Sequence, residues 1–95
     1  MLHLSKKLKS TFTILNDKGL HTRPSTELVR CAANFDAEIT LSYRNTSVNA
    51  KSLLGILMLA AERGAKITIE ADGPDAAAAI ATLQKLAQNR FNIRY

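Results

Sequence analysis

The run of residues 19–25, which joins a predicted strand to a predicted helix, most constrains this chain. Residues 11–15 are β-prone, and turn-forming side chains follow them directly. From residue 28 to residue 35, apolar side chains recur at helical spacing. Pro24 suits a first helical turn, because its missing N–H has no intrahelical partner to lose. The pattern therefore predicts that His21 lies where a helix begins.

A helix N-terminus offers free backbone N–H groups and positive potential, and both favour a bound anion such as phosphate. The residues that would form this anion-binding helix start are Thr22, Pro24 and Ser25. At this position His21 is expected to be uncharged and nucleophilic near neutral pH. The guanidinium of Arg23 would stabilise a phosphoryl group on it. With no second catalytic group nearby, the site favours a phosphoryl carrier over an enzyme. The alternative is that His21 merely caps the helix.

Two segments of the chain, residues 19–24 and residues 48–55, together resemble the signature segments of the HPr family. These are the histidine-containing phosphocarriers of the bacterial phosphoenolpyruvate-dependent sugar phosphotransferase system. The resemblance extends over roughly residues 12–88. It implies that His21 is the phosphorylated histidine, through Nδ1, and that Arg23 stabilises the phosphate. It also matches Ser52 to the serine that a dedicated kinase modifies in many members.

The same resemblance implies the partners. They are the phosphorylated first enzyme of the system, IIA-type acceptor domains of sugar permeases and, for Ser52, an HPr kinase/phosphorylase. It implies a monomer without a cofactor. The chain departs from the family pattern at Thr22 and Ser25, where alanine is common, and their hydroxyls are expected to bond to first-turn N–H groups. A member of the nitrogen-related branch, or a purely regulatory protein that senses metabolic state through Ser52, remains an alternative.

The order of predicted elements is strand, helix, strand, strand, helix, strand, helix. Their ranges are 12–15, 22–33, 37–43, 46–50, 53–62, 66–70 and a last helix from 74 or 75, with Gly64 ending the second helix. This order predicts an α+β open-faced sandwich, in which three helices cover one face of a mostly antiparallel four-stranded sheet. The HPr fold has this layout.

The segment 52–60 is more apolar than a surface helix with one buried stripe requires. Residue types alone favour burial of Leu54 and Met58 in the core. The alternative is an exposed patch for a partner, and the resemblance places Leu54, Leu57 and Met58 in a docking surface near His21. Ser52 is a preferred helix N-cap, which explains its presence without regulation. A phosphate there would be locally tolerated, with Lys51 beside it, but would spoil docking.

The chain has a formal net charge of +5, but the positions of the excess basic residues argue against a nucleic-acid site. The excess lies in two terminal segments without acidic residues, which contain Lys6, Lys7, Lys9, Arg90 and Arg94. We therefore expect solvated tails, with residues 1–10 as a mobile extension and residues 11–95 as one phosphocarrier domain. No aromatic basic patch or RNA-binding motif accompanies the charge, so a nucleic-acid partner is not expected.

The remaining features indicate a cytoplasmic protein. The single cysteine, Cys31, cannot form an internal disulfide, and it is expected to be a buried small side chain rather than a reactive thiol. No segment reaches the length of a membrane span, and the basic start of the chain has the wrong order for a secretory signal. Metal-ligand spacings and a P-loop pattern are absent from the sequence, so neither a metal nor ATP is expected.

Overall fold

The computed structural model describes residues 7–95. Within them the predicted order of elements is confirmed, followed by one short turn of 3₁₀ helix, η1. The elements are β1 (Lys7–Thr13), α1 (Thr22–Ala32), β2 (Glu38–Tyr43), β3 (Thr46–Asn49), α2 (Leu53–Met58), β4 (Lys66–Asp72), α3 (Ala76–Gln88) and η1 (Arg90–Asn92).

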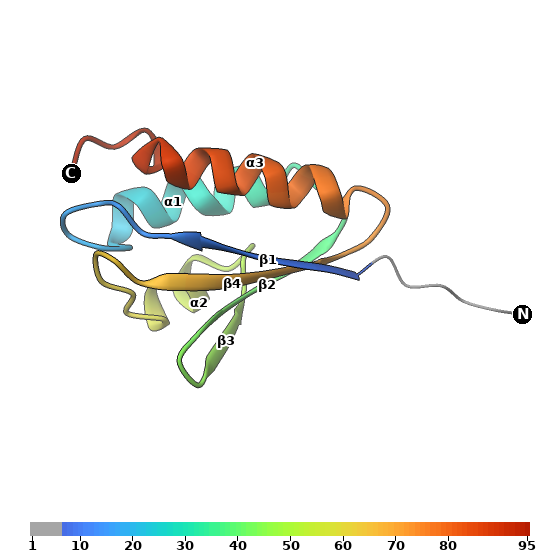
Figure 1. The fold of residues 1–95 in the computed structure, drawn as a ribbon, viewed down its shortest axis with the longest axis horizontal. Coiled ribbons are helices and arrows are strands. Elements are labelled where there is room, and N and C mark those ends of the chain that lie inside the picture. The colour runs from blue at the N-terminus through green and yellow to red at the C-terminus, as the bar shows by residue number, and fades with distance from the viewer. Residues whose placement is uncertain (1–6) are drawn as a thin grey trace, which may run out of the picture.

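The strands form one sheet in the order β1-β4-β2-β3, with antiparallel pairing throughout. Alternate residues of β4 are buried, so one face of the sheet meets the core while the other faces solvent. In Figure 1, α1 and α3 lie over the buried face, and α2 packs against α1 and β3. Buried alanines on α3 let that helix approach the sheet closely. The predicted open-faced sandwich is confirmed.

The first strand begins earlier than the sequence analysis predicts. Residues 7–10 pair in register with residues 69–72 of β4, and the Lys7 ammonium lies 3.1 Å from a Glu70 carboxylate oxygen. The prediction of a mobile extension is therefore wrong for residues 7–10, where backbone pairing with β4 holds the chain. Residues 1–6, including Lys6, lie outside the described residues.

The second helix is shorter than predicted. It ends at Met58, and Ala60 takes a left-handed conformation with φ 50°, four residues before the predicted stop at Gly64. The chain then turns back toward α1, and the backbone N–H of Leu20 donates to the carbonyl of Ala61 at 2.8 Å. The early end of α2 therefore supports the loop that precedes α1.

The segment after α3 is folded onto the domain, so the prediction of a solvated tail is wrong there. Phe91 is fully buried, and the carbonyl of Arg90 accepts a hydrogen bond from the Asn16 side chain. Three consecutive residues, 90–92, have positive φ between 54° and 61°, which turns the chain sharply back. This segment lies at the same end of the molecule as α2 and the start of α1 (Figure 1). None of the helices within residues 7–95 is long and apolar enough to cross a membrane.

Candidate functional site

His21 is the N-cap residue of α1, as predicted. Its backbone is extended, and its carbonyl accepts the first helical hydrogen bond, from the N–H of Ser25 at 3.0 Å. Thr22 and Arg23 precede that bond, so their N–H groups have no intrahelical acceptor, and Pro24 has no N–H at all. The imidazole makes no capping hydrogen bond. The alternative that the His21 side chain merely caps the helix is therefore wrong.

The loop before His21 is held from both sides. Gly19 has φ 69°, and a Cβ there would collide with the carbonyl oxygen of Ala61, so the close approach requires glycine. Leu20 donates its N–H to that same carbonyl, and its own carbonyl accepts the hydroxyl of Ser25 at 3.0 Å. Because both peptide groups of Leu20 are fixed, the backbone that carries His21 has a defined orientation.

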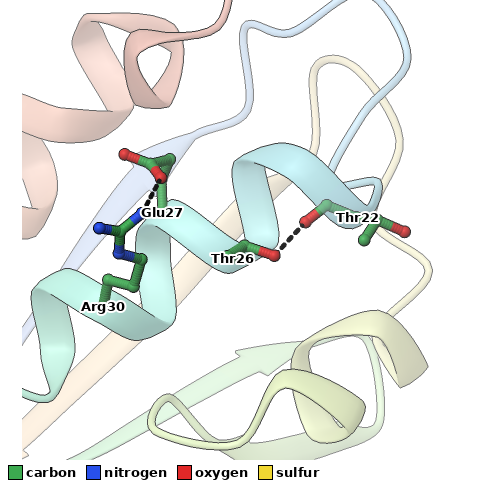
Figure 2. A network of polar contacts seen from close by, with 4 residues as sticks. All are labelled: Thr22, Thr26, Glu27 and Arg30. Atoms are coloured by element: carbon green, nitrogen blue, oxygen red, sulfur yellow. Dashed lines mark hydrogen bonds and ion pairs between the residues drawn. The ribbon is translucent and has the colours of Figure 1, made fainter.

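The hydroxyls in the first turn do not bond to N–H groups, which corrects the prediction for Thr22 and Ser25. Ser25 is fully buried and donates to Leu20, whereas the Thr22 hydroxyl makes no hydrogen bond to any described residue. Figure 2 shows the Thr26 hydroxyl directed at the Thr22 carbonyl, with a distance of 2.8 Å. One turn further on, Arg30 and Glu27 form an exposed ion pair at 3.4 Å. These side chains leave the N–H groups of Thr22 and Arg23 free for an anion.

The two ring nitrogens of His21 differ in their surroundings. Nε2 is buried and has no hydrogen-bond partner among residues 7–95, while Nδ1 is not enclosed in this way. The imidazole stacks on the ring of Tyr95, with centroids 5.8 Å apart and planes inclined by 23°. Of the two ring nitrogens, only Nε2 is therefore both shielded from solvent and without a partner among the described residues.

Arg23 is exposed, and its Nη1 donates a hydrogen bond of 2.7 Å to the hydroxyl of Tyr95. The Lys18 ammonium lies 5.4 Å from the centroid of the same ring. Tyr95 thus contacts His21 and two cationic side chains. Tyr95 is not among the predicted site residues, because the end of the chain was expected to be a solvated tail. The apolar residues Phe91 and Ile93 were the only signal that this segment packs.

Ser52 caps α2, because its hydroxyl accepts the N–H of Gly55 at 3.0 Å. The N-cap prediction is confirmed. Lys51 does not accompany it as predicted, since its ammonium donates to the carbonyl of Phe35, just after α1, at 2.6 Å. A phosphate on Ser52 would therefore have to rely on the helix N-terminus rather than on a free neighbouring ammonium.

The apolar helix α2 buries only part of its surface. Ile56 is fully buried and Leu57 is half-buried, whereas Leu54 is 70% exposed and Met58 is 66% exposed. We call Leu53, Leu54 and Met58, all exposed, the α2 apolar patch. The core interpretation is wrong for Leu54 and Met58, and a patch of this kind is typical of an interaction surface.

Two further groups bear on other chemistry. Cys31 is half-buried rather than fully buried, and this burial raises the pKa of its thiol, which opposes reactivity as a thiolate. Within residues 7–95, no cluster of three histidine, cysteine or acidic side chains could hold a metal ion.

A family model described as the phosphorylation site of the HPr component of the phosphotransferase system, PTS, matches residues 8–89. The chain belongs to the HPr family. It is 43% identical over 84 residues to the phosphocarrier protein HPr of Cupriavidus necator, covering 88% of this chain and 94% of that protein. It is 40% identical to that of Xylella fastidiosa, covering 90% and 96%. The chain is therefore a phosphocarrier of the PTS and not a catalytic enzyme.

Solved structures agree with this assignment. HPr-C-His of Thermoanaerobacter tengcongensis superposes with a TM-score of 0.87 at 34% identity, covering 93% of this chain and 99% of that one. HPr of Bacillus anthracis superposes with a TM-score of 0.80 at 34% identity, and the match covers 84% of this chain and 95% of that one. A chain of an HPr dimer of T. tengcongensis superposes with a TM-score of 0.72 at 36% identity, and the match covers 86% of this chain and 94% of that one. Because a dimer is among these structures, a monomeric state remains a prediction for this chain.

Proposed function

We propose that His21 accepts a phosphoryl group from the phosphorylated first enzyme of the system and passes it to IIA-type acceptor domains in the cytoplasm. The observation that carries this proposal is the position of His21 at the start of α1. There the N–H groups of Thr22 and Arg23 have no intrahelical partners, and the Arg23 guanidinium bonds to Tyr95, the ring on which His21 stacks. A monomer suffices, because every one of these groups comes from a single chain.

The enclosed Nε2 supports Nδ1 as the reacting nitrogen. In the neutral imidazole that attacks through Nδ1, the proton resides on Nε2. The Nδ1 lone pair forms the N–P bond while the bond from phosphorus to the donor group breaks, and the electrons of that bond stay with the donor. The helix N–H groups and the Arg23 guanidinium then stabilise the phosphate oxygens. Transfer to the acceptor breaks the N–P bond in the same manner.

The α2 apolar patch, together with Leu57, supports docking of donor and acceptor next to His21, because α2 packs against α1. Burial of Leu54 and Met58 against a partner would contribute favourable free energy without any change of fold. Met58 is flexible and polarisable, which suits a surface that must fit several partners in turn.

Ser52 is the proposed regulatory site, modified by an HPr kinase/phosphorylase. Its phosphate would lie at the N-terminus of α2, where the helix tolerates negative charge. It would also be adjacent in sequence to Leu53 of the α2 apolar patch, so it would place charge where a partner docks. We therefore expect phosphorylation at Ser52 to weaken association and to leave the fold intact.

The test of the proposed function is phosphorylation by the purified first enzyme with phosphoenolpyruvate. A phosphohistidine is labile in acid and stable in base, whereas a phosphoserine resists acid. The parent should take up an acid-labile phosphate, and His21→Ala should take up none. Acid-labile uptake by His21→Ala would place the acceptor elsewhere, and no uptake by the parent would favour a purely regulatory protein. Subsequent transfer to purified sugar and nitrogen-branch IIA domains would distinguish those two branches.

A further inference from the structure

We infer that Tyr95 is a positioning residue for phosphoryl transfer, holding the Arg23 guanidinium beside His21 through its hydroxyl and limiting imidazole rotation through its ring. The inference rests on the proposed function, because it concerns how the site around His21 is prepared for the phosphate.

The segment that carries Tyr95 is anchored deep in the domain. Phe91 is fully buried and meets the ring of Phe12 edge-on, with centroids 6.3 Å apart. The side chain of Asn16, itself buried, donates to the carbonyl of Arg90 at 2.9 Å. Asn16 lies in the loop before His21, so this bond ties that loop directly to the chain that leads to Tyr95. Tyr95 therefore reaches His21 from a fixed anchor.

The hydroxyl of Tyr95 restrains Arg23. An exposed arginine side chain loses rotamer freedom when it is fixed, and this cost normally falls on the step that binds the anion. The 2.7 Å hydrogen bond from Arg23 Nη1 to Tyr95 Oη restricts the rotamers of Arg23 before any phosphate is bound. A guanidinium has several further N–H donors, so this one bond leaves others for a phosphate on His21. Preorganisation of this kind favours transfer.

The ring of Tyr95 acts on the histidine itself. Its stacking contact covers one face of the imidazole and leaves the ring fewer orientations. The Lys18 ammonium and the Arg23 guanidinium both lie within 6 Å of the Tyr95 centroid, at 5.4 Å and 5.8 Å. The ring on which His21 stacks thus also contacts two cationic side chains, whose charge favours an anionic group at this site.

Two substitutions separate the hydroxyl from the ring. Tyr95→Phe removes only the hydrogen bond to Arg23, whereas Tyr95→Ala removes the stacking as well. We expect the rate of phosphoryl acceptance from the first enzyme to fall about 2- to 10-fold in Tyr95→Phe, the range for one hydrogen bond, and further in Tyr95→Ala. In an Arg23→Ala background, Tyr95→Phe should have no additional effect, because the hydroxyl then has no guanidinium to hold.

Tyr43→Phe is the matched control, since it removes a hydroxyl that bonds to Glu62 instead, and it should transfer at the parent rate. Proton NMR gives a readout independent of transfer: loss of the stacked ring in Tyr95→Ala should shift the His21 ring signals, and Tyr95→Phe should shift them little. Thermal melts verify that each variant is folded.

Several results would overturn the inference. Tyr95→Phe could transfer at the parent rate or faster. It could also lower the transfer rate by the same factor in the parent and in the Arg23→Ala background. Finally, the His21 NMR signals could stay unchanged in Tyr95→Ala. Faster transfer would mean that Tyr95 competes with the phosphate for Arg23. Failure of the proposed function would be recognised by a different result. In that case His21→Ala would take up acid-labile phosphate, or the parent would take up none.

Discussion

The side-chain amide of Asn16 and the backbone carbonyl of Arg90 form a 2.9 Å hydrogen bond between residues 74 positions apart in the chain. Asn16 follows β1, and Arg90 follows α3, so one polar contact fastens two loops at the end of the molecule that carries His21. The Asn16 side chain is also one of only two buried polar side chains among the described residues.

Truncation of this contact should destabilise the domain. Asn16→Ala removes one of the two donors to the Arg90 carbonyl, which keeps the backbone N–H of Ile93, so the loss of this one hydrogen bond should cost about 0.5–1.5 kcal/mol of unfolding free energy. Urea denaturation measures the loss. Asn34→Ala, at an exposed position just after α1, is the control and should change stability by less than about 0.5 kcal/mol. Equal stability of the two variants would contradict a structural role for the bond.

Substitution of Arg23 should separate transfer from stability. The side chain is exposed, so Arg23→Ala should alter the unfolding free energy by less than about 1 kcal/mol. Transfer to His21 should slow markedly, and Arg23→Lys should recover it only in part, because an ammonium lacks the planar fork of a guanidinium. Rates from rapid-quench kinetics and stabilities from denaturation give the comparison. A large loss of stability with unchanged transfer would make Arg23 a structural residue.

The α2 apolar patch should contribute to binding and not to the core. Leu54→Gln changes a side chain that is 70% exposed, so the variant should melt close to the parent and bind the first enzyme more weakly. Ile56→Ala, two residues on and fully buried, should instead lower the unfolding free energy by about 2–5 kcal/mol. Calorimetric titration measures binding to the first enzyme, and circular dichroism melts measure the stability of each variant. Normal binding by a folded Leu54→Gln would remove Leu54 from the docking surface.

Negative charge at Ser52 should inhibit without unfolding. Ser52→Asp keeps an acceptor for the Gly55 N–H and places an anion at the α2 N-terminus, so its melting temperature should not fall. Ser52→Ala loses the cap, at a cost of about 0.5–2 kcal/mol. Transfer to His21 should slow in Ser52→Asp and recover at high donor concentration, because association is weakened rather than chemistry. If Ser52→Asp bound the donor at parent affinity, Ser52 would be a helix cap alone.

The stability of the domain should depend on Asp75 in acid. Its carboxylate accepts the N–H groups of Asp36 and Ala37, both at 2.8 Å, and these bonds lower the pKa of Asp75, that from Asp36 most strongly. Since the folded pKa lies below the unfolded value, the stabilisation is present above the unfolded pKa and is lost as pH falls through the folded one. Melting temperature against pH should show a smaller decrease in acid for Asp75→Ala than for the parent. Parallel curves would rule out this contribution.

Strong local patterns explain what the sequence could predict. The apolar spacing of α1 and the alternation in β2 and β4 depend on residues close together in the chain, and these elements lie within about two residues of their predicted bounds. The start of β1 was missed because its first residues are largely polar and exposed, and their pairing partners lie in β4, about 60 residues away. Local pattern carries no information about such pairing.

The predicted extent of α2 failed for a related reason. Nothing in the sequence between Leu59 and Gly64 requires a helix to stop, but Ala60 turns out of the helix and the Ala61 carbonyl is used by Leu20. Tyr95 was missed because its partners, Lys18, His21 and Arg23, lie more than 70 residues earlier. His21 and Arg23 were found because adjacent residues define their helix start.

The lysines at the start of β1 have a consequence for self-association. With the order β1-β4-β2-β3, the edge strands of the sheet within residues 7–95 are β3, which is only four residues long, and the seven-residue β1. An exposed strand edge invites a second chain to continue the sheet, and charged side chains oppose that addition. Lys7 and Lys9 lie on this longer edge, so a second strand would have to pack against their charges. Lys7 and Lys9, which first suggested a solvated tail, would therefore oppose edge-to-edge aggregation.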